Sequence, residues 1–411
     1  MIANDRVSEV ILNYAARIGS AQDLDALLEL NAAMARDLAG ADRCSLWLVD
    51  AKAKQLWTKV AQGIQEIRIP LGQGLVGACV TGNETILVND TAADERFLNR
   101  VDDKSGYVTR SVLAIPLRGS DGQPIGALQV LNKPGGFSPE DVDLLGLSSA
   151  YSASVLEAQR LRHEAEVARL MLRELEIARN VQQRLLPQST PAMAGLDCAG
   201  YCRSAKFVGG DYYDFLLMAD GGLLFTLGDV SGKGIAAAVL MAGIQGSLRA
   251  QVVTPPQSLA TLMNHFNQTV YSFSLADRYS TLVCGLIDPG LRKVRYVNAG
   301  QVAPMLLRSD GSVARLDAGG FPVGLIEIAE YEQGELPLAP GDAIVCFSDG
   351  ITEATNEKEE MWDDGIVEKV LAGCQGLSAK DMIARLVAEA DAFTGEAEQA
   401  DDMTVVVLRV T

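Results

Sequence analysis

Histidine is scarce in this chain of 411 residues, with only His163 and His265 present. Neither lies in a distinctive motif, which argues against a Ser-His-Asp enzyme, and two histidines cannot supply a histidine-rich zinc site. If the chain binds a catalytic metal, carboxylates must therefore hold it. Carboxylate oxygens favour Mg²⁺ or Mn²⁺.

Paired cysteines are also lacking. The seven cysteines are odd in number and scattered, and no C-x-x-C motif occurs. This argues against a disulfide framework or a cysteine-ligated zinc site, and for a reducing compartment. The first residues lack the basic and apolar regions of a secretory signal, and no apolar run approaches the ~20 residues of a membrane span. We expect a cytoplasmic protein that is not in a membrane.

Positive charge is in deficit, because 35 Lys and Arg face 53 Asp and Glu, which gives a net charge of −18. Such a surface repels a phosphate backbone, so we expect no nucleic-acid partner. The simplest interpretation of most acidic residues is a solvated surface.

The pattern of elements predicts an α+β chain with two domains joined by a long helix. Residues 1–138 open with two helical patterns and continue with short strand-like runs between glycine-rich turns. Residues 139–187 read as the linker helix. Residues 188–411 contain strands in adjacent pairs with helices among them, which indicates antiparallel sheets covered by helices.

The linker helix has distinct start and stop signals. Ser138 is a good N-cap, Pro139 suits the first helical position and Asp141 completes a capping box, while Pro187 ends the pattern. Residues at spacings of three and four then form a heptad seam with one polar member, Gln182. This stripe favours a parallel dimeric coiled coil; the alternative is a helix packed on its own domain. The seam comprises Ala168, Met171, Leu175, Ala178, Gln182 and Leu185.

Four aspartates in residues 188–411 stand at strand ends or in tight glycine-flanked turns. A carboxylate that emerges from an apolar strand is costly unless it is paired or metal-bound, and a neighbouring glycine lets backbone carbonyls approach a cation. The alternative for each one is an ordinary Asp-Gly turn, and spacing alone leaves both interpretations open. The four residues are Asp211, Asp229, Asp349 and Asp401.

The sequence around these aspartates is similar to a known family. The segments GGDYYDF, GDVSGKG, FSDGITEA and ADDMTVVVLR occur in that order over about 200 residues. They resemble the metal-dependent protein phosphatase (PPM) family, in particular its bacterial SpoIIE/RsbU-like branch, and LEIARNVQQRLLP at 175–187 resembles the segment that leads into that branch's catalytic domain. The resemblance implies a PPM α-β-β-α sandwich for residues 188–411 and serine/threonine phosphoprotein phosphatase activity.

The resemblance also implies roles for the site residues. Asp229 matches the aspartate that bridges two Mn²⁺ or Mg²⁺ ions, and the Val230 carbonyl matches a ligand of the second ion. Asp349 and Asp401 match ligands of the first ion, and Asp211 matches an acidic residue that contacts the second ion directly or through water. The implied reaction is attack on phosphorus by a hydroxide held between the two ions.

Three residues near the aspartates could also take part in the chemistry, as general acid, metal ligand or phosphate-binding group. Ser231 stands where the eukaryotic branch carries a histidine as candidate general acid, so no general acid is assigned here. Asp402 occupies a position that often carries an amide and ranks below Asp401 as a ligand. Lys233 could steer phosphate, although a solvated lysine is the simpler interpretation. GDVSGKG lacks the spacing of a P-loop, which argues against ATPase chemistry.

The N-terminal part of the chain resembles a GAF sensor domain over about residues 20–160. The resemblance implies an antiparallel sheet with helices and a small-molecule ligand. Asn132-Lys133, Phe137 and Asp141 match only part of the pattern of cyclic-nucleotide-binding members, and Asp141 already serves the capping box. The segments that carry the resemblance are PLGQGLVG at 70–77, DERF at 94–97, IPL at 115–117, Ile125-Gly126 and Asn132-Lys133.

Together these features predict a sensor-regulated phosphatase. The GAF-like domain would receive a signal, and the linker helix would transmit it in a homodimer. The catalytic domain would act on a phosphorylated regulatory protein such as an anti-anti-sigma factor. The alternative is a non-catalytic signalling module, a pseudophosphatase that acts through partner binding. That alternative predicts lost metal ligands, whereas all the matching aspartates are present.

Overall fold

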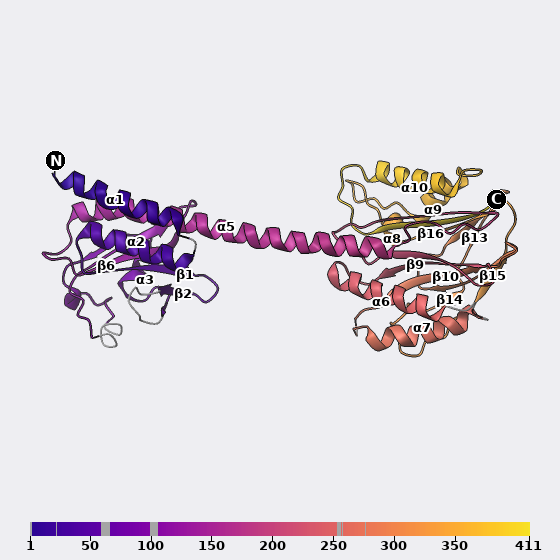
Figure 1. Ribbon diagram of the computed structural model, residues 1–411, viewed down its shortest axis with the longest axis horizontal. Helices are drawn as coiled ribbons and strands as arrows, with labels where there is room; N and C mark the ends of the chain where they lie inside the picture. Colours follow the sequence, from indigo (N-terminus) through magenta and orange to yellow (C-terminus); the bar gives the residue numbers. More distant parts are fainter. Residues whose placement is uncertain are drawn as a thin grey trace. The chain divides into compact units, whose positions relative to one another are not determined.

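The computed structural model describes residues 2–21, 23–58, 66–98, 106–252, 256, 258–275 and 277–411. Contacts divide the chain into two compact units, Met1–Arg169 and Leu170–Thr411, and helix α5 (Pro139–Leu185) runs through the boundary without a break (Figure 1). No helix among the described residues is both long and apolar enough to span a membrane. The predicted domain boundaries at 138 and 187 stay predictions.

The first unit is a six-stranded antiparallel sheet in the order β3-β2-β1-β6-β5-β4. Its elements are α1 (Ile2–Ser20), α2 (Leu24–Ala39), β1 (Arg43–Asp50), β2 (Gln55–Thr58), β3 (Ile67–Pro70), α3 (Gly74–Gly82), β4 (Ile86–Val88), β5 (Val112–Arg118) and β6 (Pro124–Leu131).

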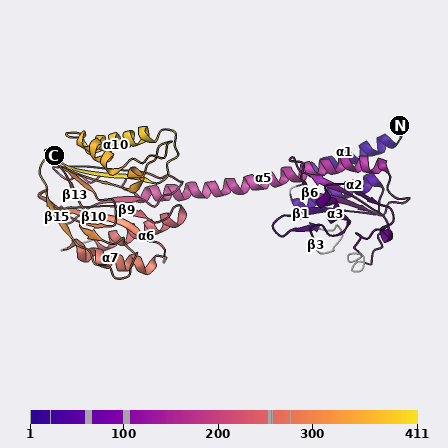
Figure 2. The ribbon, with the colours of Figure 1, turned by 180° about the vertical axis from the view of Figure 1, so that it is seen from behind.

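Helices cover both faces of this sheet. α1 and α2 lie side by side (Figures 1 and 2) and share a core with the start of α5 and one face of β1, β5 and β6. α3 packs on the other face, where Trp47 and Leu56 are buried. Asp23 caps α2 by accepting a hydrogen bond from the Ala26 N–H at 2.7 Å, and Gly40 ends it in the left-handed conformation that favours glycine.

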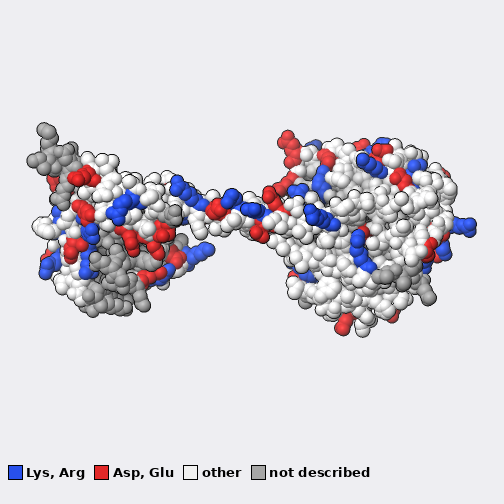
Figure 3. All heavy atoms as spheres, viewed as in Figure 1, with Lys and Arg blue, Asp and Glu red and all other residues white. Residues whose placement is uncertain are grey.

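One half of the predicted capping box of α5 forms, because the Asp141 side chain reaches back to the Ser138 N–H while the Asp141 N–H donates to the Ser138 carbonyl. The Asp141 carboxylate accepts hydrogen bonds from the Ser138 N–H at 2.9 Å and the Ser138 hydroxyl at 3.3 Å. Further along, basic and acidic side chains alternate on the surface of the helix (Figure 3), with pairs such as Glu166 and Arg169 at 3.0 Å. Such pairs keep an exposed helix solvated and add modest helix stability.

The second unit contains two antiparallel sheets. Their strand orders are β14-β11-β10-β9-β8 and β13-β12-β16-β17-β7, and β15 also pairs with β11. The elements after α5 are β7 (Leu196–Arg203), β8 (Tyr212–Leu217), β9 (Leu223–Val230), α6 (Ile235–Gln251), α7 (Leu259–Phe273), β10 (Ser280–Ile287), β11 (Lys293–Ala299), β12 (Met305–Leu307), β13 (Val313–Arg315), β14 (Gly319–Gly320), β15 (Gly334–Pro337), β16 (Ala343–Phe347), α8 (Asp349–Thr352), α9 (Asp364–Ala372), α10 (Ala379–Thr394) and β17 (Met403–Val410).

The sheets stack face to face between two helical layers. α6 and α7 lie on one side, and α9 and α10 on the other (Figure 1). Alternation along β9 explains the layering: Leu224 packs in the core with α6 and α7, whereas Phe225 packs between the sheets. α9 and α10 pack on the far face of the second sheet, where Phe347 is buried. The predicted α-β-β-α sandwich is confirmed.

Candidate metal centre

The first sheet of the sandwich brings two of the predicted aspartates together. Tyr212, at the start of β8, pairs with Gly228 near the end of β9, so Asp211 and Asp229 lie at the same end of two neighbouring strands. Asp211 is 4% exposed. The Asp229 carbonyl accepts a hydrogen bond from the Ser280 hydroxyl at 2.9 Å, which fixes the strand end to β10.

The second sheet brings the other two together. β16 and β17 are antiparallel, with Phe347 opposite Val405, so Asp349 follows the end of one strand and Asp401 precedes the start of the other. The Ser348 hydroxyl connects the two loops, because it donates to the Asp402 carbonyl at 3.0 Å and accepts from the Thr404 N–H at 2.9 Å.

The two pairs are close enough to interact electrostatically. Burial, and then the charges of Asp349 and Asp401, raise the pKa of Asp229 to about 7. Burial and the neighbouring Asp229 raise the pKa of Asp211 well above its ordinary value. Burial, followed by Glu353 and Asp401, raises the pKa of Asp349. Carboxylates that repel one another in this way form a strongly negative site, which a divalent cation would stabilise.

Glycine allows the backbone to approach this site closely. A Cβ atom placed on Gly210 would lie 2.7 Å from the carbonyl oxygen of Val230 and 3.3 Å from Oδ1 of Asp229. A Cβ atom on Gly350 would lie 2.0 Å from the Asp402 carbonyl oxygen. The glycines beside the aspartates therefore let the two loops and the Val230 carbonyl meet without a side chain between them.

Asp402 has a structural role that sequence reasoning missed. Its Oδ1 accepts a hydrogen bond from the Ala205 N–H at 2.8 Å. Its Oδ2 accepts from the N–H groups of Gly210 at 2.7 Å and Asp211 at 3.4 Å. The side chain is 7% exposed. Asp402 thus holds the loop that carries Asp211, which is a sufficient reason for an acidic residue there. Its place one residue after Asp401 gave no signal of this.

Lys233 and Ser231 are both engaged by the protein. Lys233 Nζ lies 2.8 Å from Oδ2 of Asp401 and donates to the Ala400 carbonyl at 2.6 Å, so it is not a freely solvated lysine. The Ser231 hydroxyl accepts a hydrogen bond from the Tyr279 N–H at 3.0 Å. Its carbonyl accepts one from Arg278 at 2.8 Å, and these contacts hold the loop after β9.

The donor set suits a hard divalent cation. Oδ2 of Asp211 is buried and has no hydrogen-bond partner, which is costly for a carboxylate oxygen unless a cation binds it. The other donors are carboxylates and one backbone carbonyl, the oxygen ligands that Mg²⁺ and Mn²⁺ prefer. Within the part of the chain that the structure describes, no three His, Cys, Asp or Glu side chains form a ready-made metal cage. The fold brings the aspartates to one region, and their side chains do not close on a common point.

A small pocket of about 120 Å³ opens beside Asp401. Both acidic and basic side chains line it, among them Arg203, Lys233 and Glu353. Arg203 is held by Asp391 at 2.6 Å. The pocket places charged groups next to Asp401.

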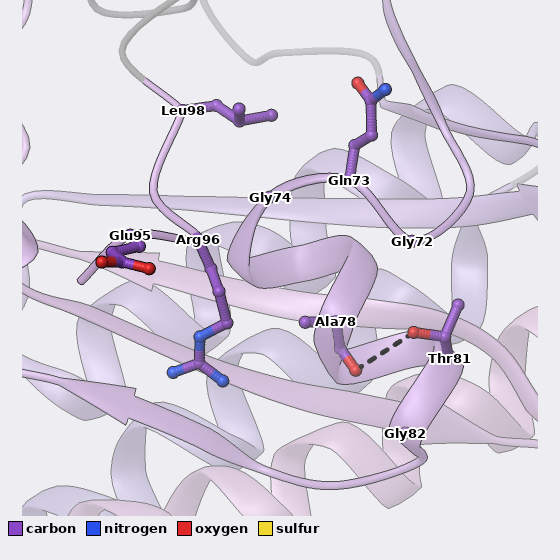
Figure 4. Close-up of a pocket in the computed structure, with 9 residues that line it drawn as sticks. All are labelled: Gly72, Gln73, Gly74, Ala78, Thr81, Gly82, Glu95, Arg96 and Leu98. Carbon is purple, nitrogen blue, oxygen red and sulfur yellow. Dashed lines mark hydrogen bonds between the residues drawn. The ribbon is translucent and has the colours of Figure 1, made fainter.

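A second pocket lies in the first unit, next to α3 (Figure 4). It has a volume of about 570 Å³ and is lined by the glycine-rich turn before α3, by α3 itself and by the segment 95–98. Arg96 lies on its wall but is paired with Asp94 at 2.7 Å. It is a candidate place for a small ligand.

The incomplete cyclic-nucleotide motif has structural roles in this fold. Lys133 forms an ion pair with Asp141. Asn132 accepts hydrogen bonds from the N–H groups of Arg110 at 2.7 Å and Ser111 at 3.2 Å. These contacts fasten the start of α5 and the end of β6, so the motif by itself does not indicate a ligand.

Comparisons with known proteins agree with this architecture. Residues 219–411 match the family model "Stage II sporulation protein E (SpoIIE)", and residues 23–155 match "GAF domain". The chain is 29% identical over 280 residues to "Phosphoserine phosphatase RsbU" of Bacillus subtilis, a match that covers 66% of this chain and 81% of that protein. It is 26% identical over 258 residues to "Protein IcfG" of Synechocystis; this match covers 55% of the chain but only 40% of that longer protein.

The structure resembles the "SiaA-PP2C domain of Pseudomonas aeruginosa", with a TM-score of 0.54 and 21% identity over 60% of this chain and 100% of that one. At this identity the likeness supports the fold. With the two family matches, it confirms the predicted fold and family at the level of the domains. The chain combines a GAF domain with a phosphatase domain of the SpoIIE type, which belongs to the PPM class of protein serine/threonine phosphatases.

Proposed function

We propose that this chain is a sensor-regulated, metal-dependent phosphatase that hydrolyses phosphoserine or phosphothreonine on a regulatory protein. The observation that carries the proposal has two parts: the two sheets bring the four aspartates to one region, where Asp349 and Asp401 act on Asp229, and Oδ2 of Asp211 is buried there without a hydrogen-bond partner. A merely structural cluster would pair these oxygens with N–H groups, as the fold does for Asp402.

Asp229, Asp349, Asp401 and Asp211, with the Val230 carbonyl, are the proposed ligands of two Mn²⁺ or Mg²⁺ ions. Such ions would supply Lewis-acid chemistry, which polarises phosphoryl oxygens and acidifies water. The chain itself orients the ligands through the strand ends and excludes water from Asp211.

Lys233 and Arg203 put positive charge beside the ligands, where it would attract the phosphate of a substrate. Ser231 stands where the eukaryotic branch carries a histidine, and an alcohol is too weak an acid to replace an imidazolium. We therefore assign no general acid for the leaving group.

The proposed partner is a phosphorylated regulatory protein of the anti-anti-sigma type. Support comes from the similarity to RsbU, whose name describes a phosphoserine phosphatase. The GAF domain would bind a small molecule and residues 139–187 would transmit the signal to residues 188–411. The net charge of −18 supports a protein partner over nucleic acid.

We also propose a homodimer through the linker helix. Val167, Leu170, Met171, Ile177 and Val181 are each at least half exposed on α5. Apolar side chains at helical spacing on an exposed helix are stabilised when a second copy covers them. The last seam positions behave differently: Gln182 is buried and Leu185 packs on its own unit. A coiled coil would therefore end before these residues.

The test is hydrolysis of phosphoserine and phosphothreonine peptides by the purified chain with Mn²⁺, Mg²⁺ or EDTA. We expect activity with metal, none in EDTA, and a loss of at least 100-fold in Asp229→Asn, on the order of other ligand and electrostatic losses in enzymes. Asp310→Asn, in an exposed turn, is the matched control. An inactive wild-type chain, or an Asp229→Asn variant as active as the wild type, would overturn the proposal.

A further inference from the structure

One buried side chain of α5 reaches the backbone beside Asp211. Gln182 is 8% exposed. Its Nε2 donates to the Gly209 carbonyl at 2.7 Å, and its Oε1 accepts from the Gly209 N–H at 3.1 Å. The amide therefore pairs with Gly209 as a neighbouring strand would, and it satisfies both backbone polar groups of a buried residue.

Asp402 holds the same segment from another direction. Its Oδ2 accepts hydrogen bonds from the N–H groups of Gly210 and Asp211. A Cβ atom on Gly209 would lie 2.1 Å from that oxygen, so the backbone has no room for a side chain there. The N–H groups of three successive residues are thus fixed by Gln182 and Asp402. This sets the direction in which the Asp211 side chain leaves the backbone.

The end of α5 is itself anchored to the catalytic unit. Leu185 and Leu186 pack on the core formed with α6 and α7. Gln245 of α6 donates to the Leu185 carbonyl at 2.6 Å, and α6 is the helix that follows the Asp229 loop. The last turns of α5 therefore contact the segment that carries Asp211 and the helix that follows the Asp229 loop.

We propose that Gln182 is a positioning residue of the metal centre, which ties the affinity of that centre for a divalent cation to the last turns of α5. The inference rests on the proposed function, because it assigns Asp211 as a metal ligand. Gln182 itself contacts neither metal nor substrate. Its amide holds Gly209, and Gly209 sets the backbone from which Asp211 projects. Mutation of groups that orient a metal ligand typically weakens metal binding by roughly 10–100-fold.

The alternative is a purely structural role, in which Gln182 only satisfies the buried N–H and carbonyl of Gly209. In that case its removal lowers the stability of the unit and leaves the intrinsic affinity for metal unchanged. The two roles separate when metal affinity is measured directly on folded protein, beside the melting temperature in EDTA.

The experiment is calorimetric titration of the full-length chain with Mn²⁺. Gln182→Met keeps the size of the side chain and removes both hydrogen bonds, and Gln183→Met, at an exposed neighbouring position, is the matched control. We expect Gln182→Met to bind Mn²⁺ at least about tenfold more weakly than the wild type, and Gln183→Met to bind like the wild type. Hydrogen exchange of the segment 204–211 should be faster only in Gln182→Met.

Each result bears on a different claim. Equal Mn²⁺ affinity in the wild type and Gln182→Met would overturn the positioning role and leave the proposed function standing. A wild-type chain that does not bind Mn²⁺ would overturn the proposed function and this inference with it. If Gln182→Met does not fold, Gln182→Glu is judged by the same criterion: it keeps the acceptor for the Gly209 N–H and places an oxygen against the Gly209 carbonyl.

Discussion

Replacing Asp402 by alanine tests whether its carboxylate holds the loop of Asp211. The change removes the acceptor of two short hydrogen bonds, from the Ala205 N–H at 2.8 Å and the Gly210 N–H at 2.7 Å, and of a longer one from the Asp211 N–H at 3.4 Å. Hydrogen bonds to a charged group contribute roughly 1.5–3 kcal/mol each, so the two short ones account for about 3–6 kcal/mol.

Two opposing effects determine how much Asp402→Ala changes the free energy of unfolding. Asp402 adds to the charge repulsion that raises the pKa of Asp211 and Asp229, so its removal relieves part of that repulsion. We therefore expect a net loss of about 2–4 kcal/mol in the free energy of unfolding of the phosphatase unit. For a unit of this size, that loss corresponds to a fall of roughly 5–15 °C in its melting temperature.

The assay is scanning calorimetry of the full chain in EDTA, with the transition of the phosphatase unit identified as the one that Mn²⁺ shifts. Asp310→Ala removes a carboxylate from an exposed turn and should lower stability by less than about 1 kcal/mol. Asp402→Asn keeps the shape of the side chain and one acceptor, and its loss of stability should lie between those of Asp402→Ala and Asp310→Ala. If Asp402→Ala were no more destabilising than Asp310→Ala, the carboxylate would not be holding the loop.

Three further results are expected from the same sandwich. Arg249→Met should destabilise the unit by about 3–5 kcal/mol in urea unfolding, because it leaves the Asp214 carboxylate buried without its ion-pair partner at 2.6 Å; a loss under about 1 kcal/mol would contradict this. Gly350→Ala should abolish Mn²⁺ binding in calorimetric titration, since its Cβ atom would lie 2.0 Å from a backbone carbonyl oxygen; unchanged binding would refute the close approach. In EDTA, the stability of the unit should fall as pH rises from about 4 to 7. Asp229 binds its proton more tightly in the folded state, with a pKa near 7 against an ordinary 3.8, so the stability present below the unfolded pKa is lost as pH rises through the folded one. Saturating Mn²⁺ should flatten this slope in melting curves, and an equal slope with and without metal would argue against the site.

Local sequence predicted much of the architecture. Ser138, Pro139 and Asp141 predicted the start of α5, and the structure starts the helix at Pro139 with the Asp141 carboxylate accepting from the Ser138 N–H. The adjacent strand pairs expected in residues 188–411 are present, as with β8 and β9 or β10 and β11. These elements are predictable because caps and apolar strand runs depend on neighbours a few residues away. Strands of two or three residues, such as β14, have too little pattern to be found this way.

The heptad seam shows where periodicity stops being informative. The same spacing continues from Met171 to Leu185, yet Met171 is exposed while Gln182 and Leu185 pack on their own unit. An apolar stripe predicts that one face of a helix packs against something. It does not predict whether the partner is the same chain or a second copy. The one polar member of the seam was the signal that its last turns differ.

The sequence by itself determined the chemistry available to this protein. Two histidines, scattered cysteines and four aspartates, three of them next to a glycine, restrict a metal centre to carboxylate and carbonyl oxygens. The tertiary structure decided which residues share a site, since Asp229 and Asp401 are far apart in the sequence, belong to different sheets and come close only because the two sheets stack. It also assigned Asp402 and Gln182 to the backbone beside Asp211. Such contacts depend on side chains from distant segments that are buried together, and local spacing carries no record of them.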